Sequence, residues 1–149
     1  MEIITKSSAE TKELGQKLAA SLIEGKRNAL TVGLIGELGA GKTTFVQGFA
    51  EGLGIKQRII SPTFILLRKY DIPNDTSRFK SLYHVDLYRI EDNIDSEARN
   101  LGLTSIWEKG GNVALIEWAE KIGNIMPKTS YAVKFEILDN STRKISVPS

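Results

Sequence analysis

The sequence predicts a three-layer α/β fold with a mixed parallel and antiparallel sheet. Short apolar runs of strand length alternate with segments whose apolar residues recur at helical spacing. A glycine-rich segment joins one of these strands directly to a helix, and two pairs of β-rich runs are separated by polar turns, as in hairpins. Helices that alternate with strands cover both faces of a sheet, so we expect one such domain over residues 1–149.

The N-terminal segment predicts a strand followed by an amphipathic helix. The strand lies near Ile3 and Ile4. Ser7 and Glu10 have the spacing of a capping box, which begins a helix, and Gly25 is expected to end it. The apolar face of this helix consists of Leu14, Leu18 and Leu22.

A phosphate-binding loop follows. Residues 36–43 read Gly-Glu-Leu-Gly-Ala-Gly-Lys-Thr, which fits the pattern G-x-x-x-x-G-K-[S/T]. Residues 30–35 before the loop form an apolar run typical of a buried strand, and residues 45–53 after it carry apolar side chains at helical spacing. Gly54 can cap that helix. The loop therefore lies between a strand and a helix, which is the context that its chemistry requires.

This loop predicts that the chain binds a nucleoside triphosphate together with Mg2+. Glycines allow successive backbone N–H groups to approach phosphate oxygens. Lys42 would place its charge on the outer phosphates, Thr43 would offer its hydroxyl to Mg2+, and the N-terminus of the next helix favours anions. The residues predicted to bind nucleotide through the loop are Gly36, Leu38, Gly39, Ala40, Gly41, Lys42, Thr43 and Thr44.

The rest of the chain predicts further strands and one more helix. Residues 58–64 contain a Ser-Pro step, which indicates the end of a strand leading into a functional loop. Residues 64–70 and 79–88 predict a hairpin with a long connection. We expect a helix over residues 92–101 and a buried strand over residues 113–117. A terminal hairpin is expected over residues 131–138 and 143–147.

Two acidic residues are candidates for catalysis. A carboxylate that helps to hold Mg2+ usually ends a buried strand that faces the loop, and Glu117 has that position. The alternative is a strand that simply reaches the surface at Glu117. Asp86 is the second candidate, because alternation along its strand puts His84, Asp86 and Tyr88 on one face. His84, the single histidine, is expected to be structural.

Composition excludes several classes of function. The chain has 20 basic and 18 acidic residues and a formal net charge of +2, which is too balanced for a protein that binds nucleic acid mainly through phosphates. It has no cysteine, which excludes disulfides and thiolate zinc sites. The first residues lack the features of a signal peptide, and no stretch is long and apolar enough to cross a membrane, so we expect a cytoplasmic protein.

The motifs and their order closely resemble those of the bacterial TsaE (YjeE) family over essentially the whole chain. They are the phosphate loop, Ser61-Pro62-Thr63-Phe64, His84-Val85-Asp86-Leu87-Tyr88-Arg89, and Leu115-Ile116-Glu117-Trp118. The resemblance implies an ATPase, with ATP and Mg2+ as cofactors, of the bacterial machinery that makes N6-threonylcarbamoyladenosine at position 37 of tRNAs. It implies TsaD and TsaB, of the threonylcarbamoyl-transferase complex, as partners, and tRNA only indirectly.

The same resemblance assigns roles to individual residues. It implies that Lys42, Asp86 and Glu117 are catalytic: Lys42 binds the phosphates and Asp86 orients the attacking water. Thr43 and Glu117 hold Mg2+. Hydrolysis is expected to be slow in the isolated chain and faster with partners that complete the site.

The resemblance also suggests residues around the nucleotide. Thr63 and Trp118 resemble switch residues. Family members often carry an acid shortly after the step that corresponds to Leu101-Gly102, where this chain has Thr104 and Ser105, so no role is carried over from that acid. The remaining candidates for binding the nucleoside are Ser8, Thr11 and Glu120.

Two rival functions follow from a phosphate loop alone. A small-molecule kinase needs an acceptor pocket and usually a mobile lid with arginines, and residues 71–78 are too short and too poor in arginine for such a lid. A regulatory GTPase would carry an Asn-Lys-x-Asp guanine motif and an Asp-x-x-Gly switch, and the sequence contains neither. Adenine is therefore the expected base.

Overall fold

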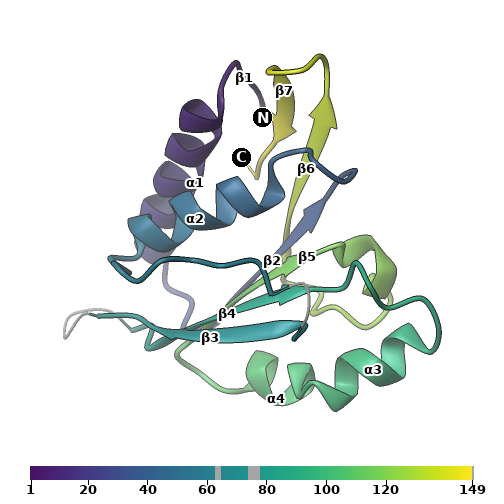
Figure 1. Ribbon diagram of the computed structural model, residues 1–149. Helices are drawn as coiled ribbons and strands as arrows, with labels where there is room; N and C mark the ends of the chain where they lie inside the picture. Colours follow the sequence, from purple (N-terminus) through teal and green to yellow (C-terminus); the bar gives the residue numbers. More distant parts are fainter. Residues whose placement is uncertain (63–64, 74–77, 149) are drawn as a thin grey trace.

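A seven-stranded mixed sheet forms the middle layer of the molecule (Figure 1). The computed structural model describes residues 1–62, 65–73 and 78–148. The strands lie in the order β1-β7-β6-β2-β5-β4-β3. In chain order the elements are β1 (Glu2–Thr5), α1 (Ser8–Ile23), β2 (Leu30–Ile35), α2 (Lys42–Gly52), β3 (Leu67–Asp71), β4 (Ser81–Asp86), α3 (Ile94–Asn100), α4 (Leu103–Glu108), β5 (Asn112–Glu117), the 3-10 helix η1 (Ala119–Ile122), β6 (Tyr131–Ile137) and β7 (Arg143–Ser146).

The centre of the sheet is parallel and its edges are antiparallel. β2 pairs in parallel with β6 and β5, and β5 pairs in parallel with β4. β3 runs antiparallel to β4, and β7 runs antiparallel to both β6 and β1. Both predicted hairpins are confirmed. Because parallel strands end at the same edge of a sheet, the carboxyl ends of β2, β4 and β5 lie close together, which is where ligands bind in such folds.

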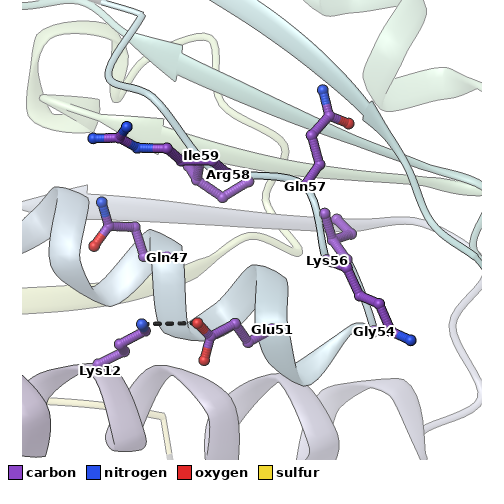
Figure 2. A pocket seen from close by; sticks show the side chains of 9 residues that line it. Lys12, Gln47, Glu51, Gly54, Lys56, Gln57, Arg58 and Ile59 are labelled. Carbon is purple, nitrogen blue, oxygen red and sulfur yellow. Dashed lines mark ion pairs between the residues drawn. The ribbon is translucent and has the colours of Figure 1, made fainter.

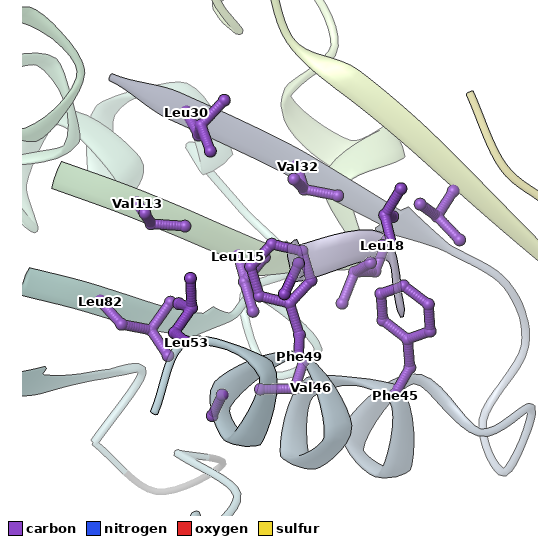
Figure 3. Packing of buried hydrophobic residues seen from close by; sticks show 14 of the residues in the cluster. Leu18, Leu30, Val32, Phe45, Val46, Phe49, Leu53, Leu82, Val113 and Leu115 are labelled. Carbon is purple, nitrogen blue, oxygen red and sulfur yellow. The ribbon is translucent and has the colours of Figure 1, made fainter. Parts of the chain in front are cut away.

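Helices cover both faces of the sheet and produce the three layers that the sequence predicted. α1 and α2 pack on one face, where Phe49 of α2 lies beside Leu115 of β5 and Phe45 belongs to the same buried cluster (Figure 3). α3, α4 and η1 cover the other face, where Leu103 of α4 belongs to the same cluster as Ile116 of β5. In the part of the chain that the structure describes, no helix has the length and apolar character needed to cross a membrane.

α1 and α2 approach each other closely because glycines face the contact. A Cβ atom added at Gly48 of α2 would lie 1.9 Å from the carbonyl oxygen of Lys12, and one added at Gly15 of α1 would lie 2.3 Å from that of Phe45. Both distances are far below van der Waals contact. This contact secures the helix that begins at the phosphate loop.

The strand that the sequence predicted to end within residues 58–64 is wrong for the residues that the structure describes. Ile59 is buried, Ile60 is 50% exposed, and neither belongs to a strand. The Ile60 N–H instead donates a hydrogen bond to the Tyr70 hydroxyl at 3.2 Å. An apolar run resembles a strand, but here no neighbouring strand pairs with it. Phe64, the end of that prediction, lies outside the described residues.

The helical region after β4 also differs from the prediction. The helix expected over residues 92–101 is the shorter α3, and the sequence did not predict α4. Gly102 separates the two helices with a φ of +85°. α4 has only 6 residues, and its buried residues are Leu103 and Ile106. A helix of this length is too short to show a clear apolar period.

Candidate active site

The phosphate loop connects β2 to α2 at the carboxyl edge of the sheet. Gly41 is the residue that precedes α2, and its φ of +99° is strained for any side chain with a Cβ. Within the loop, the Ala40 N–H donates to the Glu37 carbonyl at 3.1 Å. From β7, Arg143 donates from Nη2 to the Gly39 carbonyl at 3.1 Å. The first backbone N–H groups of α2 are thereby presented next to the loop, where phosphate oxygens can accept from them.

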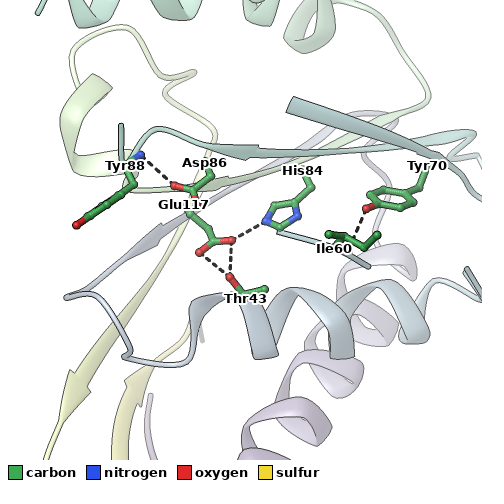
Figure 4. Close-up of polar contacts among 7 residues, drawn as sticks. All are labelled: Thr43, Ile60, Tyr70, His84, Asp86, Tyr88 and Glu117. Carbon is green, nitrogen blue, oxygen red and sulfur yellow. Dashed lines mark hydrogen bonds and ion pairs between the residues drawn. The ribbon is translucent and has the colours of Figure 1, made fainter. Parts of the chain in front are cut away.

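Thr43, His84 and Glu117 form a hydrogen-bonded cluster (Figure 4). The Thr43 hydroxyl lies 3.1 Å from Oε1 and 3.0 Å from Oε2 of Glu117. His84 Nε2 lies 2.6 Å from Glu117 Oε2. Glu117 is only 3% exposed and His84 is fully buried. The strand that ends at Glu117 therefore faces α2 and does not simply reach the surface.

Asp86 lies beside this cluster at the end of β4. It is in register with Glu117 on β5. Its Oδ1 accepts a hydrogen bond from the Tyr88 N–H at 2.9 Å. Burial raises the pKa of the Asp86 carboxyl, and the neighbouring Glu117 carboxylate adds to the shift, while Lys42 opposes it. A carboxyl group with a raised pKa at the end of a strand is a candidate proton acceptor.

Lys42 is buried within the loop and lies against an aromatic ring. Its Nζ donates to the carbonyls of Gly36 and Glu37 and lies 4.0 Å from the ring centroid of Trp118. Burial lowers the pKa of Lys42. The charges of nearby acids oppose this shift, and Glu117 opposes it most strongly. Trp118 has a φ of +64°, which is rare for a bulky residue, and this turn brings its ring over the lysine.

These side chains surround a cavity of about 220 Å³, called here the catalytic cavity. It brings together most of the predicted site residues from the loop, β4 and β5. Its lining consists of Leu38, Gly39, Gly41, Lys42, Thr43, Thr44, Ser61, Asp86, Tyr88, Glu117 and Trp118. The sequence analysis did not name Tyr88 or Ser61 as site residues, although both lie in the motifs that carried the family resemblance.

A second cavity of about 210 Å³, the flanking cavity, lies on the β7 side of the loop. Gly39, Gly41 and Thr44 line both cavities. The flanking cavity is further lined by Ser7, Ser8, Thr11, Asn140, Ser141 and Arg143. Ser8 and Thr11 thus lie beside the loop, and their contact with the nucleoside stays a prediction. Thr11 also has a structural contact, because its hydroxyl lies 2.8 Å from that of Thr5. No local sequence signal indicated that Arg143 would reach the loop.

Other predicted nucleotide-binding residues do not line these cavities. Gly36 contributes its carbonyl to Lys42, and Ala40 is fully buried. Glu120 is exposed on η1 and acts on Lys42 only through its charge. Thr63 lies outside the described residues. The roles of these residues stay predictions.

A larger hollow, of about 600 Å³, lies between α1, α2 and the segment after α2 (Figure 2). Lys12, Glu51 and Arg58 are among its lining residues, but no residue of the phosphate loop is. Lys12 is already paired with Glu51, at 2.8 Å between Nζ and Oε1. This hollow therefore lacks the chemistry expected of the triphosphate site.

The catalytic cavity fits Mg2+ bound together with a nucleotide. Mg2+ prefers oxygen ligands and is usually held by one or two protein groups plus phosphates and water. The hydroxyl of Thr43 and the carboxylate of Glu117 lie within hydrogen-bond distance of each other and are such ligands. Among the described residues, no group of three or more His, Cys, Asp or Glu could hold a metal without such help.

The mixed sheet covered by helices on both faces, together with the phosphate loop, identifies the fold as that of the phosphate-loop NTPases. Comparison with known proteins then identifies the family. The family model described as "Threonylcarbamoyl adenosine biosynthesis protein TsaE" matches residues 5–145. The chain therefore belongs to the TsaE family, whose name refers to biosynthesis of threonylcarbamoyladenosine.

Individual relatives agree with this assignment. The tRNA threonylcarbamoyladenosine biosynthesis protein TsaE of Bacillus subtilis is 39% identical over 142 residues, which cover 95% of this chain and 81% of that protein. The protein of the same name from Treponema pallidum is 35% identical over 150 residues, or 99% of each chain. The crystal structure of Bacillus subtilis YdiB has a TM-score of 0.73 and 33% sequence identity, and the match covers 97% of this chain and 82% of that chain.

Proposed function

We propose that the chain is a single-domain, Mg2+-dependent ATPase, residues 1–149, that supports tRNA threonylcarbamoyladenosine synthesis in the cytoplasm through TsaD and TsaB. It contacts tRNA only indirectly in this proposal. The observation that carries the proposal is the direct contact of Thr43, the loop residue expected at Mg2+, with the buried carboxylate of Glu117. Membership of the TsaE family supports the biological role.

The residues of the catalytic cavity divide the work of hydrolysis. Lys42 and the N-terminus of α2 bind the phosphates, and Thr43 and Glu117 hold Mg2+, which when bound neutralises charge on the phosphates. Asp86 orients the attacking water, which fits its place in the same cavity and the rise of its pKa on burial. Phosphoryl transfer requires mainly such positioning and charge.

The test is Mg2+-dependent ATP hydrolysis by the purified chain, alone and with TsaD and TsaB. We expect slow hydrolysis that the partners accelerate. Glu117→Ala should lower the rate at least about 100-fold, the scale of losing one electrostatic contact to a transition state. Glu108→Gln, at an exposed position on α4, is the matched control and should keep wild-type activity. Absence of stimulation, or a rate indifferent to Glu117, would overturn the proposal and leave a nucleotide-binding protein.

The kinase alternative would need an arginine of the lid segment at the nucleotide, and the arginine described in that segment has other partners. Arg78, the arginine of the segment considered as a lid, donates from Nε to the Arg27 carbonyl at 2.9 Å and from Nη2 to the Ile23 carbonyl at 3.3 Å. These contacts hold it beside the end of α1. A screen for ATP-dependent phosphorylation of small metabolites would distinguish a kinase from the proposed ATPase.

A further inference from the structure

His84 is placed to act on Glu117. It is the only histidine of the chain and is fully buried on β4. Its register partner on β5 is Leu115, so Glu117 lies diagonally opposite, two residues further along β5, on the same face of the sheet. The short contact between His84 Nε2 and Glu117 Oε2, 2.6 Å, follows from this register (Figure 4).

The surroundings of the ring indicate which nitrogen carries the proton. An ionised carboxylate can only accept hydrogen bonds, so the Nε2 that faces Glu117 must be the donor. His84 Nδ1 is buried and has no hydrogen-bond partner among the residues that the structure describes. A proton on Nδ1 would be a buried donor without an acceptor, which is unfavourable. The geometry therefore favours a ring that is protonated at Nε2 and bare at Nδ1.

This hydrogen bond restricts the carboxylate. Thr43 lies within hydrogen-bond distance of both oxygens of Glu117, whereas His84 contacts only Oε2. The imidazole is a rigid ring and is fully buried, so it acts as a fixed donor. In metal sites, ligand side chains are commonly oriented by such partners behind them, and losing the partner weakens metal binding by about 10–100-fold.

We propose that His84 is a positioning residue: by donating from Nε2 to Oε2 it holds the Glu117 carboxylate toward Thr43 and so raises the affinity of the site for the Mg2+ that accompanies ATP. The proposal rests on the proposed ATPase function. If His84 only filled the core, the loss of its N–H donor would not change the metal affinity of the site.

Three variants separate these two views. His84→Leu removes the donor and introduces an apolar side chain of similar size, while His84→Gln keeps an N–H that can reach Glu117. Leu82→Ala is the matched control, because Leu82 is fully buried on the same strand and the same face but belongs to the apolar core. Binding of Mn2+ in the presence of a non-hydrolysable ATP analogue, followed by electron paramagnetic resonance, measures metal affinity, and nucleotide affinity is measured in EDTA.

We expect His84→Leu to weaken metal binding about tenfold or more. Its nucleotide affinity without metal should stay within about twofold of wild type, and His84→Gln should recover most of the lost metal affinity. Leu82→Ala should lower stability and leave metal affinity unchanged. Wild-type metal affinity in His84→Leu, or no recovery in a folded His84→Gln, would overturn the role of His84. A wild-type chain that binds no metal-nucleotide complex would overturn the proposed function together with this inference.

A second measurement needs neither metal nor a His84 variant. Because the chain has one histidine, its imidazole 15N signals can be assigned without ambiguity. We expect them to report a ring protonated at Nε2 in the metal-free protein, and Glu117→Gln should shift the Nε2 signal more than the Nδ1 signal. A ring that is bare at Nε2, or signals that Glu117→Gln leaves unchanged, would overturn the inference even if His84→Leu fails to fold.

Discussion

Asp86 and Glu117 are buried acids that end neighbouring strands in register and share one cavity with Lys42. Burial disfavours the charged forms of Asp86 and Lys42, which is why the pKa of Asp86 is raised and that of Lys42 is lowered. Burial of these two charges therefore opposes folding, and the attraction between Lys42 and the acids offsets part of this cost. Sites that bind phosphate and metal commonly retain such unfavourable groups because activity needs them.

At the residue scale, we expect Asp86→Asn to lose most ATP hydrolysis while remaining as stable as wild type, or more stable, at pH 7. Burial raises the pKa of Asp86 above its ordinary value of 3.8. The folded chain then keeps a proton that the unfolded chain has lost, so the stability linked to this residue is present below that value and is lost as pH rises through the raised pKa. Asparagine has no such charge, and its Oδ1 can still accept from the Tyr88 N–H.

Urea unfolding without nucleotide, from about pH 4 to pH 8, measures the difference in unfolding free energy between Asp86→Asn and wild type. The stability of Asp86→Asn relative to wild type should increase as pH rises. Asp92→Asn, at an exposed position, is the control and should keep both its activity and a constant stability difference from wild type. A relative stability of Asp86→Asn that falls with rising pH would contradict the expected sign.

At the element scale, the close contact between α1 and α2 predicts that alanine at Gly48 destabilises the protein, although helix propensity alone predicts the opposite. Alanine is favoured over glycine in a helix by about 0.5–1 kcal/mol. A Cβ at Gly48, however, would lie 1.9 Å from the Lys12 carbonyl oxygen. We expect crowding to dominate, and Gly48→Ala to lose roughly 1–3 kcal/mol of unfolding free energy or more. Thermal or urea unfolding would measure the loss.

Gly25→Ala is the control for this substitution. Its added Cβ would lie no closer than 3.4 Å to the Leu22 carbonyl oxygen. We expect a change within about 0.5 kcal/mol, as for most exposed positions. If Gly48→Ala were as stable as Gly25→Ala, α1 and α2 would have to separate easily, and the close contact would not be important for stability.

Lys121 of η1 stabilises the segment that follows β4. Its Nζ donates to the carbonyls of Leu87, Tyr88 and Ile90 at 3.0, 2.9 and 2.9 Å. Such charge-assisted bonds contribute about 1.5–3 kcal/mol each when buried, and less when water has access. We therefore expect Lys121→Met to lower the unfolding free energy by roughly 1–3 kcal/mol in total. It should also slow hydrolysis, because this segment directly follows Asp86 and includes Tyr88, whose N–H donates to Asp86.

Urea unfolding and ATP hydrolysis test this prediction together. Lys109→Met, at an exposed position, should change neither the unfolding free energy nor the rate appreciably. Equal effects of the two substitutions would mean that loss of surface charge, rather than of the three carbonyl contacts, is responsible.

At the scale of the whole molecule, the two ends of the chain pair with each other in the sheet, and the C-terminal strand also contacts the phosphate loop. The Met1 amino group donates to the Val147 carbonyl at 3.0 Å, and the termini lie near each other in Figure 1. β1 pairs with β7, and Arg143 of β7 contacts Gly39. The C-terminal strand β7 therefore pairs with the edge strand β1 and also contributes to the surroundings of the phosphate loop.

Because the site draws on the loop, β4 and β5, nucleotide binding should stabilise the whole fold. A ligand at 100 times its Kd adds about 2.7 kcal/mol, which raises the Tm of a chain of this size by about 5–10 °C. We expect this shift with Mg2+ and a non-hydrolysable ATP analogue, and a smaller one in EDTA. The guanine analogue at equal concentration is the comparison. A larger shift with guanine would contradict the expected preference for adenine.

Patterns among neighbouring residues in the sequence determined the phosphate loop and most of the helices and strands. The phosphate loop is encoded in neighbouring residues and in backbone freedom at positions such as Gly41, so it could be identified without tertiary contacts. Strand and helix periods predicted the three layers and both hairpins. The same patterns failed at residues 58–62, which pair with no strand, and at α4, which is too short to show a period.

Only the tertiary structure decided which side chains meet. Parallel register between β4 and β5 brings His84 to Glu117, and the packing of α2 brings Thr43 to the same carboxylate. Arg143 reaches the loop through the order of the strands. These contacts join residues far apart in the chain, and their geometry depends on register and packing, which local periodicity does not encode.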